Sequence, residues 1–363
     1  MTLDVDVVLS RGSFRLDAQF ATEGRLTALF GPSGSGKSTV VDLIAGLARP
    51  DRGRIRVDDA VLVDTDRRIF VPPHRRRIGY VFQDARLFPH LSVSQNLRYG
   101  RFFAPAAGRY ATFDAIVALL GIGHLLDRRP SGLSGGERQR VAIGRALLAS
   151  PRLILMDEPL ASLDEARKAE IMPYIERLRD EVRIPIVLVS HSVAEVARLA
   201  TDMVVLANGA VTAAGPTGEI LRRLDILPAS ERAEGGSLLA MTVERADDGY
   251  GLTVLAGPAG EVFVPAIDRT AGATVRVRVR ARDVTVTLDP PSRGSALNVL
   301  RCSVSAIETG DGAHADVTLD CGGQPLLARL TRRSVAQLGL APGMAAFAVL
   351  KSVGLEGAAS DGV

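Results

Sequence analysis

Residues 26–38 read Leu-Thr-Ala-Leu-Phe-Gly-Pro-Ser-Gly-Ser-Gly-Lys-Ser, and this stretch decides the fold of the N-terminal part of the chain. Its first five residues form a short apolar run, which is typical of a buried strand. The glycine-rich part has the spacing G-x-x-x-x-G-K-[ST], whose backbone N–H groups converge on phosphate oxygens. Apolar residues then recur at helical spacing from Val40 to Leu47, so a strand, a loop and a helix follow in order. The predicted phosphate-binding residues are Gly31, Pro32, Ser33, Gly34, Ser35, Gly36, Lys37, Ser38 and Thr39.

A second apolar strand ends in two carboxylates. Residues 153–156 are Leu-Ile-Leu-Met, and Asp157 and Glu158 follow them. A carboxylate at the tip of a strand can hold Mg²⁺, directly or through water, as the Ser38 hydroxyl also can. A carboxylate beside it can accept a proton from an attacking water. Taken alone, such a pair is an ordinary polar strand end as often as it is a functional site. Beside a phosphate loop, it predicts a Mg²⁺ ligand and a catalytic base.

Residues 133–137, Leu-Ser-Gly-Gly-Glu, are a second place where a phosphate could bind. Ser134, Gly135 and Gly136 form a turn that opens a helix, and the positive end of a helix dipole attracts anions.

The order of these motifs resembles that of the ABC-transporter ATPases. The resemblance further identifies Gln83 as the Q-loop glutamine, residues 162–164 as the D-loop and His191 as the switch histidine. It implies that Gln83 contacts Mg²⁺ and senses the attacking water, and that His191 contacts the γ-phosphate of ATP. It also implies that the 134–136 turn binds the γ-phosphate held by another subunit, so that a head-to-tail homodimer encloses two ATP molecules. Phe14 is the best-placed residue to stack on adenine, and a core role for it stays open.

Helix and strand patterns alternate up to about residue 225, which predicts a mostly parallel sheet covered by helices. With the resemblance, the fold class is α/β: a P-loop ABC-type nucleotide-binding domain with a mixed sheet and a helical subdomain, then an all-β, OB-like region. We expect the ATPase domain at 1–228, a linker and a first β half-repeat at 229–290, and a further β-domain at 291–357. Residues 84–130 are expected to be mostly helical.

A faint internal repeat begins at residues 241 and 302. Each half has the order strand, Asp-Gly turn, strand, glycine turn, strand and final apolar strand, which predicts paired small β-barrels. Residues 274–288 alternate valine with arginine. We expect one strand there, with its arginines on a solvated face.

Composition excludes several classes of protein. The 363 residues carry a net charge of +3 with no long basic block, so nucleic-acid binding has little support. No stretch approaches the roughly 20 apolar residues of a spanning helix, and the first residues show no signal-peptide pattern. Cys302 and Cys321 lack C-x-x-C spacing, so we expect two reduced, buried thiols. Lysine occurs only at positions 37, 168 and 351, and Lys168 is expected on a solvated helix.

Two regions resemble the ATPases of molybdate importers. Residues 80–100 correspond to the groove that receives the permease, where Phe88 and Leu91 would supply apolar contact or belong to the core. Residues 293–355 resemble a molybdate-binding (Mop) domain. Oxyanion binding needs hydroxyl groups, N–H groups and a cation, and Leu297 stands where that family often has an arginine. The candidate oxyanion residues are Ser295, Ser334, Lys351 and Ser352, and a purely structural or dimerising role for this domain stays open.

The resemblance implies the ATP-hydrolysing subunit of an ABC importer that energises molybdate uptake. Its cofactors would be ATP and Mg²⁺. Its partners would be a second copy, two membrane permease subunits and, indirectly, an external molybdate-binding protein. It would be a peripheral protein on the cytoplasmic face of the inner membrane, and it would bind no nucleic acid.

Three alternatives remain. An importer of sulfate, tungstate, ferric iron or a sugar would carry the same ATPase motifs. A soluble ABC ATPase of DNA repair or translation would usually have two cassettes or a long coiled coil, and neither is visible. A molybdate store or sensor would not need Glu158.

Overall fold

The computed structural model describes residues 2–103, 109–161, 163–182, 184–291, 294–310, 312–351 and 354–356. The chain divides into two compact units, Met1–Thr217 and Gly218–Val363.

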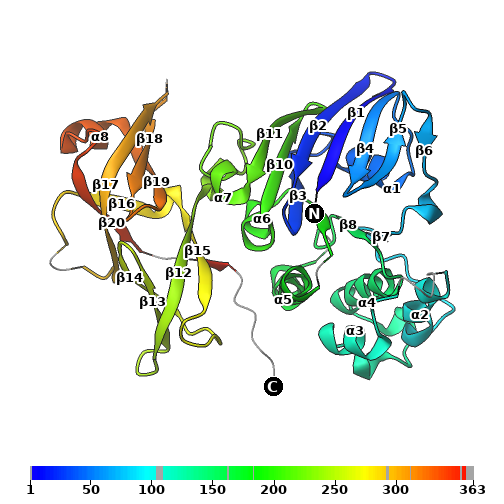
Figure 1. The fold of residues 1–363 in the computed structure, drawn as a ribbon. Coiled ribbons are helices and arrows are strands. Elements are labelled where there is room, and N and C mark those ends of the chain that lie inside the picture. The colour runs from blue at the N-terminus through cyan, green and yellow to red at the C-terminus, as the bar shows by residue number, and fades with distance from the viewer. Residues whose placement is uncertain are drawn as a thin grey trace. The chain divides into compact units, whose positions relative to one another are not determined.

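An eleven-stranded mixed sheet forms the centre of the first unit (Figure 1). Its order is β6-β5-β4-β1-β2-β11-β10-β3-β9-β8-β7. Strands β10, β3, β9, β8 and β7 run parallel to one another, whereas the strands from β6 to β2 pair antiparallel. Strand β11 joins the two parts, antiparallel to β10 and parallel to β2. The strands are β1 (Leu3–Arg11), β2 (Phe14–Thr22), β3 (Leu26–Phe30), β4 (Arg52–Val57), β5 (Ala60–Asp64), β6 (Ile69–Phe70), β7 (Ile78–Val81), β8 (Leu153–Asp157), β9 (Ile186–Ser190), β10 (Asp202–Ala207) and β11 (Ala210–Pro216).

The parallel strands place the predicted site residues at one edge of the sheet. All five residues of β3 and of β9 are buried, as expected for strands covered on both faces. Phe30 pairs with Ser190, and Asp157 pairs with Val189. Because parallel strands end on the same edge, the segments that follow β3, β7, β8 and β9 meet there.

Helices pack on the sheet and form a separate group beyond β7. Figure 1 shows α2, α3 and α4 together, and α4 contacts α2, α3 and β7. This confirms the helical subdomain. Residues 84–92 are irregular, however, and the Asn96 side-chain amide donates to backbone carbonyls there, where a helix would use backbone N–H groups. None of the described helices has the length and apolarity needed to cross a membrane. The helices and 3₁₀ turns are α1 (Lys37–Ala45), η1 (Pro73–Arg75), α2 (Val93–Phe103), α3 (Phe113–Leu119), η3 (Gly123–Leu125), η4 (Pro130–Gly132), α4 (Gly135–Leu148), α5 (Glu165–Glu181) and α6 (Val193–Leu199).

The second unit contains two five-stranded antiparallel sheets, ordered β14-β13-β12-β15-β21 and β16-β20-β17-β18-β19. The internal repeat is confirmed, since β12 to β15 and β17 to β20 pair in the same pattern and both halves break register near the same point. The strand that follows each half crosses to the other sheet, since β16 pairs with β20 and β21 pairs with β15. Residues of both sheets form one hydrophobic cluster, so the halves are not two separate barrels. The elements are α7 (Thr217–Ile220), η5 (Arg232–Glu234), β12 (Gly236–Asp247), β13 (Leu252–Gly257), β14 (Gly260–Pro265), β15 (Thr274–Arg280), η6 (Ala281–Asp283), β16 (Val284–Thr287), β17 (Asn298–Thr309), β18 (His314–Asp320), β19 (Pro325–Thr331), α8 (Arg332–Leu338), β20 (Ala345–Leu350) and β21 (Gly354–Glu356).

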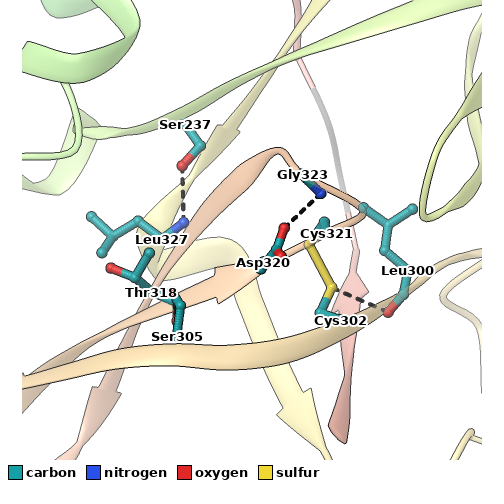
Figure 2. The surroundings of a disulfide bond; sticks show 9 residues. All are labelled: Ser237, Leu300, Cys302, Ser305, Thr318, Asp320, Cys321, Gly323 and Leu327. Carbon is teal, nitrogen blue, oxygen red and sulfur yellow. Dashed lines mark hydrogen bonds between the residues drawn. A yellow bond between two sulfur atoms is a disulfide. The ribbon is translucent and has the colours of Figure 1, made fainter. Parts of the chain in front are cut away.

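The expectation of two reduced thiols is wrong, because Cys302 and Cys321 form a disulfide (Figure 2). Ser303 pairs with Asp320 in the β17–β18 hairpin, so the two cysteines lie opposite each other, with their Cα atoms 4.4 Å apart. A turn in which Asp320 accepts a hydrogen bond from the Gly323 N–H follows directly. The sequence spacing hid this pair because it does not reveal which residues face each other across a hairpin.

The arginine-rich run is also different from the expectation. The 3₁₀ turn η6 divides it into β15 and β16, so it is not a single strand. Arg278 is only 8% exposed and bonds both the carbonyl and the carboxylate of Glu234, and Arg280 pairs with Asp283. The connector around η5 therefore covers this face, and Arg278 is not solvated.

Candidate nucleotide site

The glycine-rich loop and α1 form a cavity of about 430 Å³. It is lined by Phe14, Ser33, Gly34, Gly36, Lys37, Ser38, Thr39 and Glu158. Gly36 precedes α1 with a φ of +105°, and a Cβ there would lie 2.8 Å from the Leu16 Cδ1. Glycine adopts that backbone freely, whereas a residue with a Cβ would be strained there and would press on the Leu16 side chain. Phe14, the predicted adenine partner, lines the same cavity.

Lys37 is held at this loop and is only 4% exposed. Its Nζ donates to the carbonyl oxygens of Gly31, at 2.8 Å, and Pro32, at 2.9 Å. Burial lowers the pKa of Lys37, and the charges of Glu158 and Asp157 oppose that shift. The ammonium group therefore lies where an anion in the cavity can attract it.

Ser38 and Asp157 come together across the edge of the sheet. The Ser38 hydroxyl donates to the Asp157 Oδ1 at 3.1 Å. Burial raises the pKa of Asp157, the Ser38 hydrogen bond opposes the shift, and the Glu158 charge adds to it. A hydroxyl and a carboxylate in contact are the oxygen donors that Mg²⁺ prefers, so these residues fit that ion.

Glu158 projects into the cavity from a strained backbone. Its φ is +45°, and its N–H donates to the Val189 carbonyl at 3.2 Å. The His191 Nδ1 lies 3.6 Å from the Glu158 Oε2, and the histidine side chain is 57% exposed. Strained residues concentrate at functional sites. The structure thus brings the predicted base and switch histidine together.

A buried ion pair lies behind His191. Ser190 donates to the Glu195 Oε2 at 2.6 Å, and the Lys168 Nζ lies 3.2 Å from the Glu195 Oε1. The first turns of α5 are exposed, as expected, but the Lys168 side chain itself is only 17% exposed and is paired with a carboxylate. The lysine links α5 to the segment that carries His191. The one sequence signal for a special role of Lys168 was the rarity of lysine in this chain.

Gln83 lies at the same edge of the sheet but is exposed and does not line the cavity. Its segment is fixed by α4 instead. Gln139 donates to the Phe82 carbonyl at 3.4 Å, and Arg145 donates to the Arg86 and Ala85 carbonyls at 2.8 and 3.1 Å. Sequence reasoning missed these two anchors, since an amide and a guanidinium inside a helix carry no motif.

The 134–136 turn caps α4. Ser134 accepts from the Glu137 N–H while the Glu137 carboxylate accepts from the Ser134 N–H, which completes a capping box. Ser134, Gly135 and Gly136 do not line the cavity of the phosphate loop. Of the D-loop, Asp164 caps α5 through the Arg167 N–H, and Ser162 lies outside the described residues.

The oxyanion candidates do not share a cavity among the described residues. Asn298 pairs with Leu350, so Ser295 and Lys351 lie at one end of the second sheet, and both are exposed. Ser334 lies on α8, which leaves β19 at the opposite end, and its hydroxyl bonds Thr331 at 2.7 Å. Ser352 lies outside the described residues.

Comparison with known proteins gives two family matches. Residues 18–161 match the ABC transporter family, and residues 294–355 match the TOBE domain. The chain is 61% identical to the molybdenum import ATP-binding protein ModC of Mesorhizobium japonicum over 98% of its length and 96% of that protein. It is 54% identical to the protein of the same name from Rhizobium etli, over 98% and 100% of the two chains.

Solved structures of ATP-binding cassettes match about 60% of the chain. One is described as a dimeric post-hydrolysis state of the ATP-binding cassette MJ0796 bound to ADP and Pi. It has a TM-score of 0.50 and 28% identity, and the match covers 60% of this chain and 99% of that chain. The cassette MJ1267 of an ABC transporter matches with a TM-score of 0.51 at 25% identity, over 60% and 91%.

Proposed function

The chain belongs to the family of molybdenum import ATP-binding proteins, and on that premise we propose how its residues perform the ATPase cycle. It is the ATP-hydrolysing subunit of an ABC importer for molybdate. The observation that carries the mechanism is the position of Glu158 in the wall of the phosphate-loop cavity, 3.6 Å from His191.

The phosphates of ATP would bind the loop that contains Gly34 and Gly36 and the first turn of α1, which contains Thr39. The Lys37 ammonium, 2.8 Å from the Gly31 carbonyl, adds charge that favours the β- and γ-phosphates. Phe14 lines the same cavity and would stack on the adenine ring.

Ser38 and Asp157 would hold Mg²⁺, with Gln83 approaching from the end of β7. The ion supplies positive charge to the phosphate oxygens when it is bound. The support is the 3.1 Å contact between a hydroxyl and a carboxylate, both oxygen donors, beside the phosphate loop.

Glu158 would accept the proton of the attacking water. His191 would keep the Glu158 carboxylate oriented and contact the γ-phosphate. Its position is supported by the Ser190–Glu195–Lys168 series of contacts. Such a positioned base contributes about 10²- to 10⁴-fold to a rate.

A second copy of the chain would complete each site. The 134–136 turn, where Ser134 and Glu137 cap α4, does not line the phosphate cavity of its own chain. It would instead bind the γ-phosphate of the ATP held by the partner subunit. The dimer would dock on two permease subunits, fed by an external molybdate-binding protein, at the cytoplasmic face of the inner membrane. The cassette would be residues 1–228. In the Mop domain, residues 291–357, Ser295 and Lys351, with Ser352 next in sequence, would bind molybdate at one end of the second sheet, and Ser334, at the opposite end, would not belong to that site.

The substitution Glu158→Gln tests the mechanism. The variant should bind ATP, lose about 10²-fold or more of its hydrolysis rate, and accumulate as a dimer on size-exclusion chromatography with ATP. Glu23→Gln is the matched control, because it removes an exposed carboxylate in the same unit. It should leave the hydrolysis rate and the oligomeric state unchanged. A monomeric Glu158→Gln variant with full activity would refute the assigned role.

Uptake of radiolabelled molybdate and sulfate tests the substrate. Cells lacking this chain should lose molybdate uptake and regain it on complementation. Loss of sulfate uptake with intact molybdate uptake would favour the importer of another oxyanion.

A further inference from the structure

Tyr80 lies between two carboxylates at the candidate Mg²⁺ site. Its hydroxyl is 3.4 Å from the Asp157 Oδ2 and 3.5 Å from the Asp42 Oδ1. Tyr80 belongs to β7, Asp157 ends β8 and Asp42 lies in α1 after the phosphate loop. The proposed ATPase mechanism uses neither Tyr80 nor Asp42.

Two different hydroxyl groups lie against the two oxygens of Asp157. Ser38 bonds Oδ1 at 3.1 Å, and Tyr80 approaches Oδ2. A phenol keeps its one proton at neutral pH, so the Tyr80 hydroxyl can donate to the Asp157 Oδ2. Without this donor, the carboxylate could turn about its terminal torsion, and Oδ1 would no longer be held toward Ser38.

The position of the Tyr80 hydroxyl is itself fixed by packing. Its ring stacks on Phe82 with centroids 4.1 Å apart, and the Arg86 guanidinium lies 4.1 Å from the Phe82 ring centroid. The Phe82 carbonyl accepts from Gln139. Tyr80 is therefore a rigid link between the segment that contains Gln83 and the Asp157 carboxylate.

We propose that Tyr80 is a positioning residue that orients Asp157 as a Mg²⁺ ligand, through a hydrogen bond from its hydroxyl to the Asp157 Oδ2. This rests on the proposed Mg²⁺–ATP site and deepens it. Hydrogen bonds to a metal-ligating side chain typically raise metal affinity by about 10- to 100-fold.

Isothermal titration of the full-length protein with ADP, in Mg²⁺ and in EDTA, separates this role from general packing. Tyr80→Phe keeps the ring and its contact with Phe82 but removes the hydroxyl. We expect the affinity for ADP in Mg²⁺ to fall by about tenfold and the affinity in EDTA to stay within about twofold of the wild type. The Mg²⁺ concentration for half-maximal ATP hydrolysis should rise, while kcat at saturating Mg²⁺ changes less.

Tyr110→Phe is the matched control, because it also removes a hydrogen-bonded phenol hydroxyl, which donates to the Pro151 carbonyl at 2.7 Å. It should leave both ADP affinities unchanged. The proposal is overturned if Tyr80→Phe binds ADP in Mg²⁺ like the wild type, or if both ADP affinities fall equally. A wild-type protein whose ADP affinity does not depend on Mg²⁺ would instead refute the proposed metal site.

Discussion

Replacing Lys168 by methionine tests the ion pair behind His191. The substitution keeps most of the side-chain length but removes an ammonium that lies 3.2 Å from the Glu195 Oε1 and 3.1 Å from the Glu165 Oε1. Glu195 is 7% exposed and would keep only the Ser190 hydroxyl as a side-chain partner. An uncompensated, buried carboxylate would remain.

The two ion pairs of Lys168 contribute differently to the free energy of unfolding. Glu165 is 88% exposed, so its contact contributes about 0.3–0.5 kcal/mol. Removing one partner of a fully buried pair costs about 3–5 kcal/mol, and because Lys168 keeps some contact with water we expect about 2–3 kcal/mol for Lys168→Met. In a unit of this size that lowers the melting temperature by about 5–10 °C.

The pH of the measurement does not weaken the test. Burial alone would lower the pKa of Lys168, but the hydrogen bonds and charges of Glu165 and Glu195 outweigh burial and raise it. The stabilisation is then complete below the ordinary lysine pKa and is lost only as pH rises through the folded-state pKa. At pH 7 the full contribution of the pair is measured.

Differential scanning calorimetry of the full chain is the assay, because the chain has two units and no tryptophan to serve as a fluorescent probe. Glu165→Gln is the matched control and should shift the melting temperature by about 1–2 °C at most. The double variant Lys168→Met/Glu195→Gln should recover most of the loss, since the buried charge is gone. The reasoning fails if Lys168→Met melts like the wild type, or if the double variant is no more stable than the single one.

Three further outcomes are expected. Arg76→Met should cost about 2–4 kcal/mol by calorimetry, because the buried guanidinium donates to three backbone carbonyls, two of them at the end of α1, and the variant removes all three of these hydrogen bonds; an unchanged melting temperature would contradict this. Cys302→Ser/Cys321→Ser should destabilise the second unit by about 3 kcal/mol, as expected for a loop of this length, and mass spectrometry without reductant should find the two cysteines joined in the wild type. The Ser134 N–H lowers the pKa of Glu137, so Glu137→Gln should melt below the wild type at pH 7, and this difference should vanish as pH falls through the depressed pKa; a difference that persists at acid pH would exclude the capping carboxylate as its cause.

Much of the nucleotide site could be predicted because its chemistry is local in sequence. The phosphate loop and the Asp157–Glu158 pair each follow a buried strand, and the parallel register brings their strands to one edge. Gln83 was placed at that edge as well, although it does not reach the cavity. The repeat in the second unit was visible from its turns.

The contacts that were missed depend on chain segments far apart in sequence. Lys168 looked solvated because nothing in α5 reveals that Glu195 packs against it. Arg278 looked solvated because its partner Glu234 comes from the connector, 44 residues earlier. The disulfide required the register of the β17–β18 hairpin, which the spacing of two cysteines does not contain.

Glu158 is needed for catalysis, but its φ of +45° lowers the stability of the folded chain. A residue with a Cβ costs about 1–2 kcal/mol in that left-handed region, whereas glycine adopts it freely and asparagine more readily than most. In a random library selected only for survival on heating, position 158 should therefore drift toward glycine or asparagine. Variants that outlast the parent in such a screen would be enriched for proteins that no longer turn over ATP, so a thermostabilised version has to be selected with its ATPase activity as a second criterion.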